Sequence, residues 1–163
     1  MTSLKTYALI AVSAAATTLL IQACGGGDAV AQTTTDTDAI EGVWESNVTI
    51  KDCASGAVLR TFKGAGLFHR GGSLTADNSL PRATQGIALG NWKRNAGKDY
   101  TANARFLRFN ADGSLAGSQK LQRAFTLASD GNNFAGTLTA QVLDSDGAQL
   151  QTICGSETAV RIY

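Results

Sequence analysis

The residues whose types could support chemistry are few, and they begin with an adjacent histidine and arginine. His69 is the only histidine among the 163 residues, and Arg70 follows it at the predicted end of a strand. An imidazole can act as a general base, and a neighbouring guanidinium can hold an anionic group. The alternative is a strand end whose side chains hydrogen-bond the Gly71-Gly72 turn. An imidazole without an orienting partner does not make a recognisable catalytic site.

A second set of candidates lies inside predicted strands. Arg123 shares one alternating face of its strand with Leu115, Leu121 and Phe125, and Glu157 lies in the last predicted strand. Polar side chains within apolar stripes fit a barrel whose interior is partly polar and able to hold a small ligand. The alternative places these groups at strand ends, near the rim. The candidate ligand-site residues are therefore His69, Arg70, Arg123 and Glu157.

Other motifs argue against catalytic and cofactor sites. Asp144 and Asp146 flank a turn, and two carboxylates fall well short of the roughly six to eight oxygen ligands that calcium takes. Gly64-Ala65-Gly66 matches half of a dinucleotide-binding fingerprint, but His69 stands where its last glycine would be. We expect no catalytic residue, no metal and no cofactor. The 14 basic and 13 acidic residues are scattered along the chain, so nothing indicates a nucleic-acid partner.

The elements that would position these residues are strands. Asp112-Gly113, Asp130-Gly131 and Asp146-Gly147 each stand between alternating apolar segments, a pattern typical of hairpins with a type I′ turn. They delimit predicted strands over Asp99–Asn110, Leu115–Ala128, Asn133–Leu143 and Gln149–Arg161. Period-two alternation and turn residues predict four more upstream, over Gly42–Asp52, Val58–His69, Ser73–Ala76 and Gln85–Lys93. Gly64 and Gly66 inside the second suggest a bulge or a sharp bend.

Eight long antiparallel strands with short connections favour an all-β, up-and-down barrel, because closure removes the exposed edges. A β-sandwich is the alternative, although sandwiches usually have shorter strands and longer crossings.

The N-terminus is predicted to be a signal peptide. Lys5 precedes an apolar run that is short for a membrane span. The run ends in Ile21-Gln22-Ala23-Cys24, which resembles the lipobox of bacterial lipoproteins, in which the cysteine is lipidated. The resemblance implies residues 1–23 as signal peptide and Cys24 as the anchor. Because Gly rather than Asp occupies position 25, it also implies the outer membrane. The alternative is an ordinary signal peptide cut after Ala31.

Residues 24–39 are predicted to be a flexible tether, and residues 40–163 the barrel. With Cys24 assigned to lipid, Cys53 and Cys154 remain. In an exported chain such a pair is predicted to form a disulfide. A metal or nucleophilic site is the alternative, but it lacks neighbouring ligands.

Gly42-Val43-Trp44 resembles the G-x-W signature of the lipocalins and the wider calycin group. The resemblance implies a calycin-like barrel whose end is closed by Trp44, with Arg161 of the last strand packed across the indole. The chain lacks the second lipocalin motif and a C-terminal helix. It also resembles small secreted bacterial proteins of unknown function, through Trp44, Cys53, the run His69–Leu74, Trp92, Tyr100 and Cys154.

Three functional classes remain open at this point. The first is an envelope-anchored binding module for a small, apolar ligand. The second is a structural or interaction lipoprotein with a packed core. The third is an enzyme of the isomerase or cyclase barrel type, which requires a pocket that gathers His69, Arg70 or Glu157. The sequence does not indicate an oligomeric state.

Overall fold

The computed structural model describes residues 37–163. The predicted signal peptide, Cys24 and all but the end of the predicted tether lie outside the described residues. The described chain forms eight strands and one short 3₁₀ helix: β1 (Gly42–Lys51), β2 (Val58–Phe68), β3 (Ser73–Asn78), η1 (Arg82–Thr84), β4 (Ala88–Ala96), β5 (Asp99–Phe109), β6 (Leu115–Leu127), β7 (Asn133–Leu143) and β8 (Gln149–Arg161). The predicted strand at Gln85 begins at Ala88 instead, and Gln85 keeps only an isolated bridge to Arg108.

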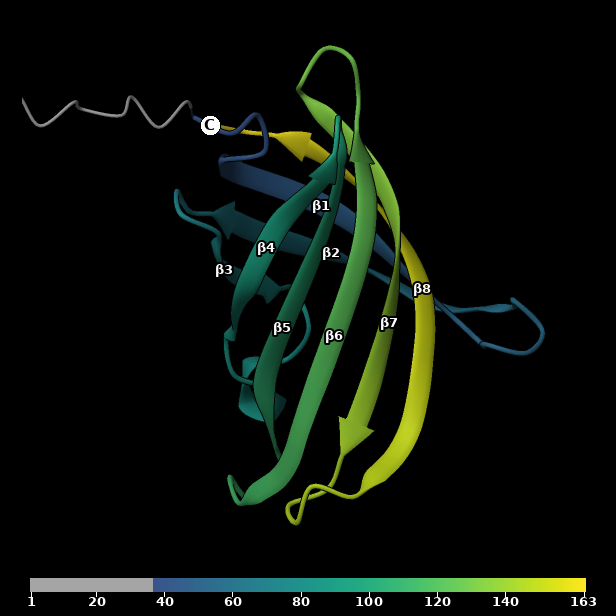
Figure 1. Cartoon of the computed structure of the whole chain (residues 1–163). Helices are drawn as coiled ribbons and strands as arrows, with labels where there is room; N and C mark the ends of the chain where they lie inside the picture. Colours follow the sequence, from purple (N-terminus) through teal and green to yellow (C-terminus); the bar gives the residue numbers. More distant parts are fainter. Residues whose placement is uncertain (1–36) are drawn as a thin grey trace, which may run out of the picture. The chain divides into compact units, whose positions relative to one another are not determined.

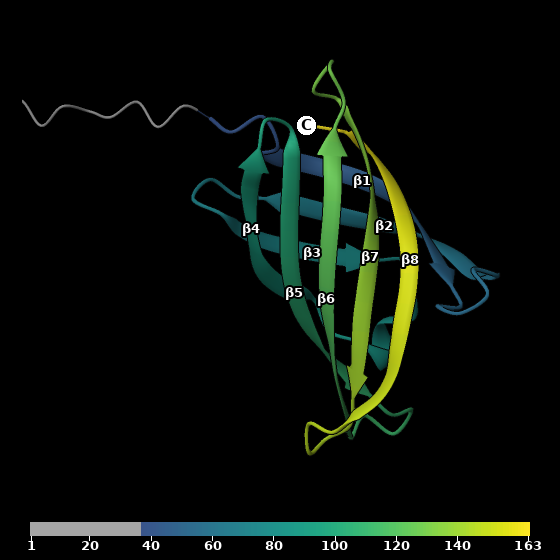
Figure 2. The same cartoon turned by 45° about the vertical axis from the view of Figure 1, so that its right-hand side comes forward.

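The strands close into one barrel in sequence order, from β1 to β8 (Figure 1). Each neighbouring pair is antiparallel, including β8 with β1. The turned view shows the long strands β5 to β8 side by side, with β1 to β3 crossing behind them (Figure 2). The predicted up-and-down barrel is confirmed, and the β-sandwich alternative is wrong.

The Asp-Gly hairpins differ in detail from the prediction. The amides of Gly113, Gly131 and Gly147 donate to the carbonyls three residues earlier, so each Asp-Gly pair occupies the second half of its turn. The three glycines have φ values of 84°, 72° and 90°. A left-handed glycine after an ordinary turn is typical of short hairpin loops, in which the glycine corrects the twist between the strands. The loops between Asn110 and Ser114 and between Asp144 and Ala148 have three residues, whereas the loop between Ala128 and Asn133 has four. The type I′ prediction was therefore wrong, although the hairpins themselves were placed correctly.

A bulge lies in β6 and not at Gly64 and Gly66, where the sequence suggested a bulge or a sharp bend. The β1–β2 ladder runs without a register shift past Gly64 and Gly66, so no bulge lies there. The β5–β6 ladder instead shifts register where Gly117, at φ 126°, opposes Arg108. One extra residue in β6 turns Leu115 to the opposite face. Leu115 is consequently half-exposed rather than aligned with Leu121 on the inner face.

The interior divides into a packed half and a half that is partly hollow. The packed half is an aromatic cluster, whose rings lie within 6.3 Å of a neighbouring ring: Trp44, Phe68, Trp92, Tyr100, Phe125 and Phe134. The second half is lined by a smaller aliphatic cluster around Val48, Ile50 and Leu138. We call these the closed end and the open end of the barrel.

The predicted disulfide is present. Cys53, just after β1, is bonded to Cys154 in β8, across a sequence separation of 101 residues. Cys154 is also the ladder partner of Lys51. The covalent bond therefore fixes β1 to β8 toward the open end.

Candidate functional site

The open half of the barrel contains a cavity of about 100 Å³. An engineered protein cavity of about 150 Å³ holds one benzene molecule, so this space suits a small ring or a short alkyl chain. Its walls come from all eight strands and from the loop after β3, and the apolar lining includes Val48, Ile50, Phe62, Ala76, Phe106, Leu121, Leu138 and Ile153.

The floor of the cavity includes Arg123, which forms an ion pair with Glu157. Arg123 of β6 donates from Nε to Glu157 Oε1 of β8 at 2.7 Å, and from Nη2 to Oε2. The side chain of Glu157 is 1% exposed and that of Arg123 is 11% exposed. The Arg123 guanidinium carbon also lies 5.9 Å from the ring centroids of Phe68, Phe125 and Phe134. The pair thus sits on the aromatic cluster and forms the base of the hollow half.

The strand register explains how two residues on non-adjacent strands meet. Phe125 is opposite Gly136, and Gly136 is opposite Glu157, so β7 stands between the two charged residues. Gly136 has no side chain, and a Cβ there would lie 2.3 Å from the Ala124 carbonyl oxygen. A glycine is therefore required where β6 and β7 come close together, directly beside the Glu157 side chain.

The mouth of the cavity carries uncompensated positive charge. We define the mouth by Arg60, Asn78, Leu80 and Gln85, which line the end of the cavity remote from Trp44. Arg108 lies beside it through its bridge to Gln85. Its Nη1 is the only buried side-chain nitrogen or oxygen in residues 37–163 that has no hydrogen-bond partner.

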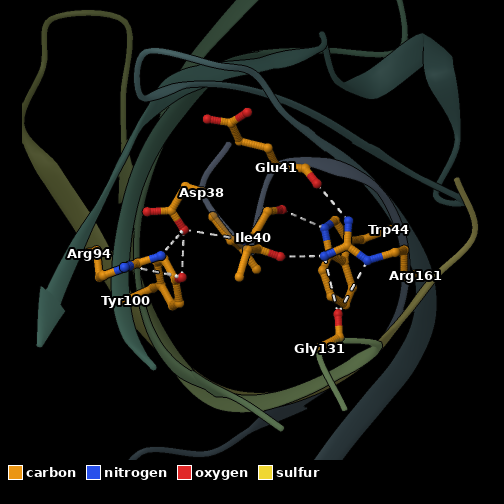
Figure 3. Close-up of polar contacts among 9 residues, drawn as sticks. Asp38, Ile40, Glu41, Trp44, Arg94, Tyr100, Gly131 and Arg161 are labelled. Atoms are coloured by element: carbon orange, nitrogen blue, oxygen red, sulfur yellow. Dashed lines mark hydrogen bonds and ion pairs between the residues drawn. The ribbon is translucent and has the colours of Figure 1, made fainter. Parts of the chain in front are cut away.

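The closed end is sealed by Trp44 and Arg161 (Figure 3). The Arg161 guanidinium carbon lies 4.3 Å from the Trp44 ring centroid, as the lipocalin resemblance implied. Arg161 also donates to the carbonyls of Glu41, Ala39 and Gly131, while the Trp44 indole donates to the Ile40 carbonyl at 2.8 Å. One guanidinium therefore holds the segment before β1 and the β6–β7 loop against the same indole.

A second polar contact fixes the segment that enters the barrel (Figure 3). Tyr100 Oη donates to Asp38 Oδ1 at 2.6 Å, and Arg94 Nη2 lies 2.9 Å from the same oxygen. Burial alone would raise the pKa of the Asp38 carboxyl, but the hydrogen bonds from Tyr100 and Arg94 outweigh it and lower that pKa. For the Tyr100 hydroxyl, burial and the bond to Asp38 raise the pKa. Ile40, between the two contacts, is fully buried.

The structure separates the four candidate ligand-site residues into two pairs. Arg123 and Glu157 meet inside the barrel. His69 Nε2 instead lies 3.0 Å from Thr75 Oγ1, on the side of β3 opposite the buried Leu74, and Arg70 contacts Thr37 and Glu41. None of His69, Arg70 and Glu157 lines the cavity of the open half, so this cavity is not the pocket that an enzyme of the isomerase type would need.

Metal-ligand clusters and membrane-spanning helices are absent from the part of the chain that the structure describes. No three residues among histidine, cysteine, aspartate and glutamate converge there as metal ligands would. Within the same residues, no helix is long and apolar enough to cross a membrane.

Sequence reasoning missed the closed-end contacts of Asp38, Arg94 and Tyr100. Asp38 and Ala39 were assigned to the tether, because the segment has few large apolar residues, yet both contact the barrel. The available signal was Ile40, an apolar residue four positions before the indole that it helps to cover. The ion pair of Arg123 with Glu157 had no local signal, since its members are 34 residues apart.

Comparison with known proteins does not add a relative. No protein-family model matches the chain, and no curated protein matches it.

Proposed function

We propose that this protein is an envelope-anchored lipoprotein whose barrel binds a small, mainly apolar ligand. The observation that carries the proposal is the cavity above the Arg123–Glu157 pair, with its apolar walls. A barrel built only for stability would fill both halves with side chains, as the aromatic cluster fills the closed half. Its lining of apolar surface with a few convergent polar groups is the usual composition of a ligand pocket.

The proposed anchor is Cys24. The strands begin at Gly42, and the described segment before them contacts the closed end. Supporting evidence is the lipobox-like sequence Ile21-Gln22-Ala23-Cys24. Fatty-acid labelling of the protein, lost in Cys24→Ser, is the expected result. Globomycin should also cause unprocessed precursor to accumulate, and an unaffected precursor would contradict the anchor.

Ligand binding is tested by filling the cavity. Ala76 lines it, whereas Ala135 is exposed on the outer face of β7. Ala76→Leu should abolish binding of short alkyl and phenyl compounds, followed by NMR shift changes of cavity residues, while the fold is kept. The matched control Ala135→Leu should bind as the wild type does.

Native mass spectrometry of the protein purified from its own host provides an independent test. A bound small molecule that Ala76→Leu loses would support the proposal. If the wild type carries no ligand and none of the probe compounds shifts its cavity resonances, the barrel is a structural or interaction module and the proposal fails.

A further inference from the structure

The Arg123 guanidinium offers an unused hydrogen-bond donor to the cavity. Nε and Nη2 are both engaged by the Glu157 carboxylate. Arg123 Nη1 donates to no described residue. In residues 37–163, the only side-chain nitrogen or oxygen that is buried and has no hydrogen-bond partner is Arg108 Nη1, so Arg123 Nη1 is not buried. Since Arg123 lines the cavity, its Nη1 is open to the cavity floor.

The charge of that donor is cancelled locally. Glu157 is bound in a two-point contact and is almost completely buried. An anion that approached Arg123 Nη1 would meet the attraction of the guanidinium and the repulsion of the carboxylate together. It would also lose its own hydration, which is costly in an apolar site. A neutral oxygen acceptor has no such penalty and still accepts the hydrogen bond.

The surroundings reinforce this preference. Phe68, Phe125 and Phe134 flank the guanidinium at 5.9 Å, and Leu138 of the cavity wall is 5% exposed. An apolar chain that extends from the floor toward the mouth would contact the aliphatic lining of the open half. The uncompensated cations, Arg60 and Arg108, lie at or beside the mouth and not at the floor.

Building on the proposed ligand-binding function, we infer that the cavity selects a small neutral molecule with a carbonyl or hydroxyl oxygen at one end of a short apolar chain. Arg123 Nη1 donates to that oxygen. Glu157 is the specificity-determining residue, because its carboxylate neutralises Arg123 and so excludes an acid from the floor.

Three probes of equal chain length test the inference by NMR titration at neutral pH: methyl butyl ketone, hexene and hexanoate. The wild type should bind the ketone about tenfold or more tightly than hexene, as expected for one hydrogen bond to a charged donor. It should also bind the ketone more tightly than hexanoate. Intermolecular NOEs should place the ketone methyl group near the floor.

Glu157→Gln leaves the Arg123 charge uncompensated, so the order of hexanoate and ketone should reverse. The matched control is Glu45→Gln, which removes a carboxylate from the outer face of β1, where Glu45 pairs with Lys63. Its probe affinities should equal those of the wild type.

A second variant tests the inference in case Glu157→Gln does not fold. The double substitution Arg123→Met with Glu157→Leu replaces a buried ion pair by apolar side chains of similar size, which proteins often tolerate. It should still bind hexene, and the ketone should lose its advantage over hexene.

The outcomes separate this inference from the function on which it rests. Equal binding of ketone and hexene by the wild type would overturn the inference and leave the binding function standing. Tightest binding of hexanoate, lost in Arg108→Met, would overturn it by locating an acid group at the mouth. Binding of none of the three probes would overturn the inference and count against the binding function as well.

Discussion

At the scale of single residues, Arg161 joins three parts of the chain that are far apart in the sequence. It covers the Trp44 ring and donates to the carbonyls of Ala39, Glu41 and Gly131. The planar guanidinium makes all of these contacts at once, with its faces toward the indole and its N–H groups toward the carbonyls. A lysine ammonium at the same position could supply the charge but not this geometry.

We predict that Arg161→Ala lowers the free energy of unfolding by about 2–4 kcal/mol, from lost charged hydrogen bonds and the lost cation–π contact. Arg161→Lys should recover only part of that loss. The measurement is urea unfolding with the disulfide intact. Lys63→Ala, which breaks an exposed pair with Glu45, should cost less than about 1 kcal/mol. Equal effects at both positions would mean that the closed end does not depend on Arg161.

At the scale of elements, the segment Asp38–Glu41 acts as a plug for the closed end. Asp38 is held by Arg94 of β4 and Tyr100 of β5, while Arg161 of β8 holds the carbonyls of Ala39 and Glu41. The segment therefore bridges opposite sides of the barrel end, as seen along the axis in Figure 3.

The lowered pKa of Asp38 gives this plug a defined pH dependence. A carboxyl with a depressed pKa in the folded state stabilises the fold fully above its unfolded pKa of about 3.9, and the contribution disappears as pH falls through the folded pKa. Asp38→Asn should therefore be less stable than the wild type at pH 7, and the difference should shrink as pH falls below about 4.

The measurement is urea unfolding of both proteins between about pH 7 and pH 2. The pKa values of Asp52, Asp112 and Asp130 are also lowered, each by hydrogen bonds within its own turn. These groups are the same in both proteins, so their effect cancels in the difference. A stability difference that stays constant across this range would show that ionisation of Asp38 does not contribute.

The sequence predicted elements better than contacts between them. Period-two alternation and the Asp-Gly pairs located β7 and β8 at their observed bounds, because both signals are local. The same alternation placed Leu115 on the wrong face, because one extra residue at the Gly117 bulge reverses the face of the β6 residues that precede it. It also indicated that Arg123 faces inward, but not that it meets Glu157, because alternation gives the face of a strand and not its position around the barrel.

At the scale of the whole molecule, the seam between β1 and β8 is fastened near both ends. Trp44 is the ladder partner of Arg161 at the closed end, and Lys51 is the partner of Cys154 toward the open end. The first pair carries the cation–π contact, and the second adjoins the disulfide from Cys53. These fastenings hold the two strands that are most distant in the sequence, where closure has the greatest entropic cost.

Removal of the disulfide should accordingly lower the free energy of unfolding substantially. For a loop of about 100 residues, chain entropy predicts a loss of about 4–5 kcal/mol. We expect the double substitution Cys53→Ser with Cys154→Ser to lower the free energy of unfolding by this order, measured in urea, while the cavity probes still bind the folded fraction. A loss below about 1 kcal/mol would show that the reduced, unfolded chain already keeps β1 near β8.

The same seam has a topological consequence. The amide of Val43 donates to the Tyr163 carbonyl, and the amide of Ile162 donates to the Val43 carbonyl, so the start and the finish of the barrel are hydrogen-bonded neighbours. The strands therefore form a closed ring in which the chain ends lie next to each other, and the position of the chain ends can be moved. A circular permutant with Tyr163 linked to Thr37 and new ends within the exposed loop Asn110–Ser114 should rebuild the same barrel, recognisable by an unchanged NMR spectrum around Arg123.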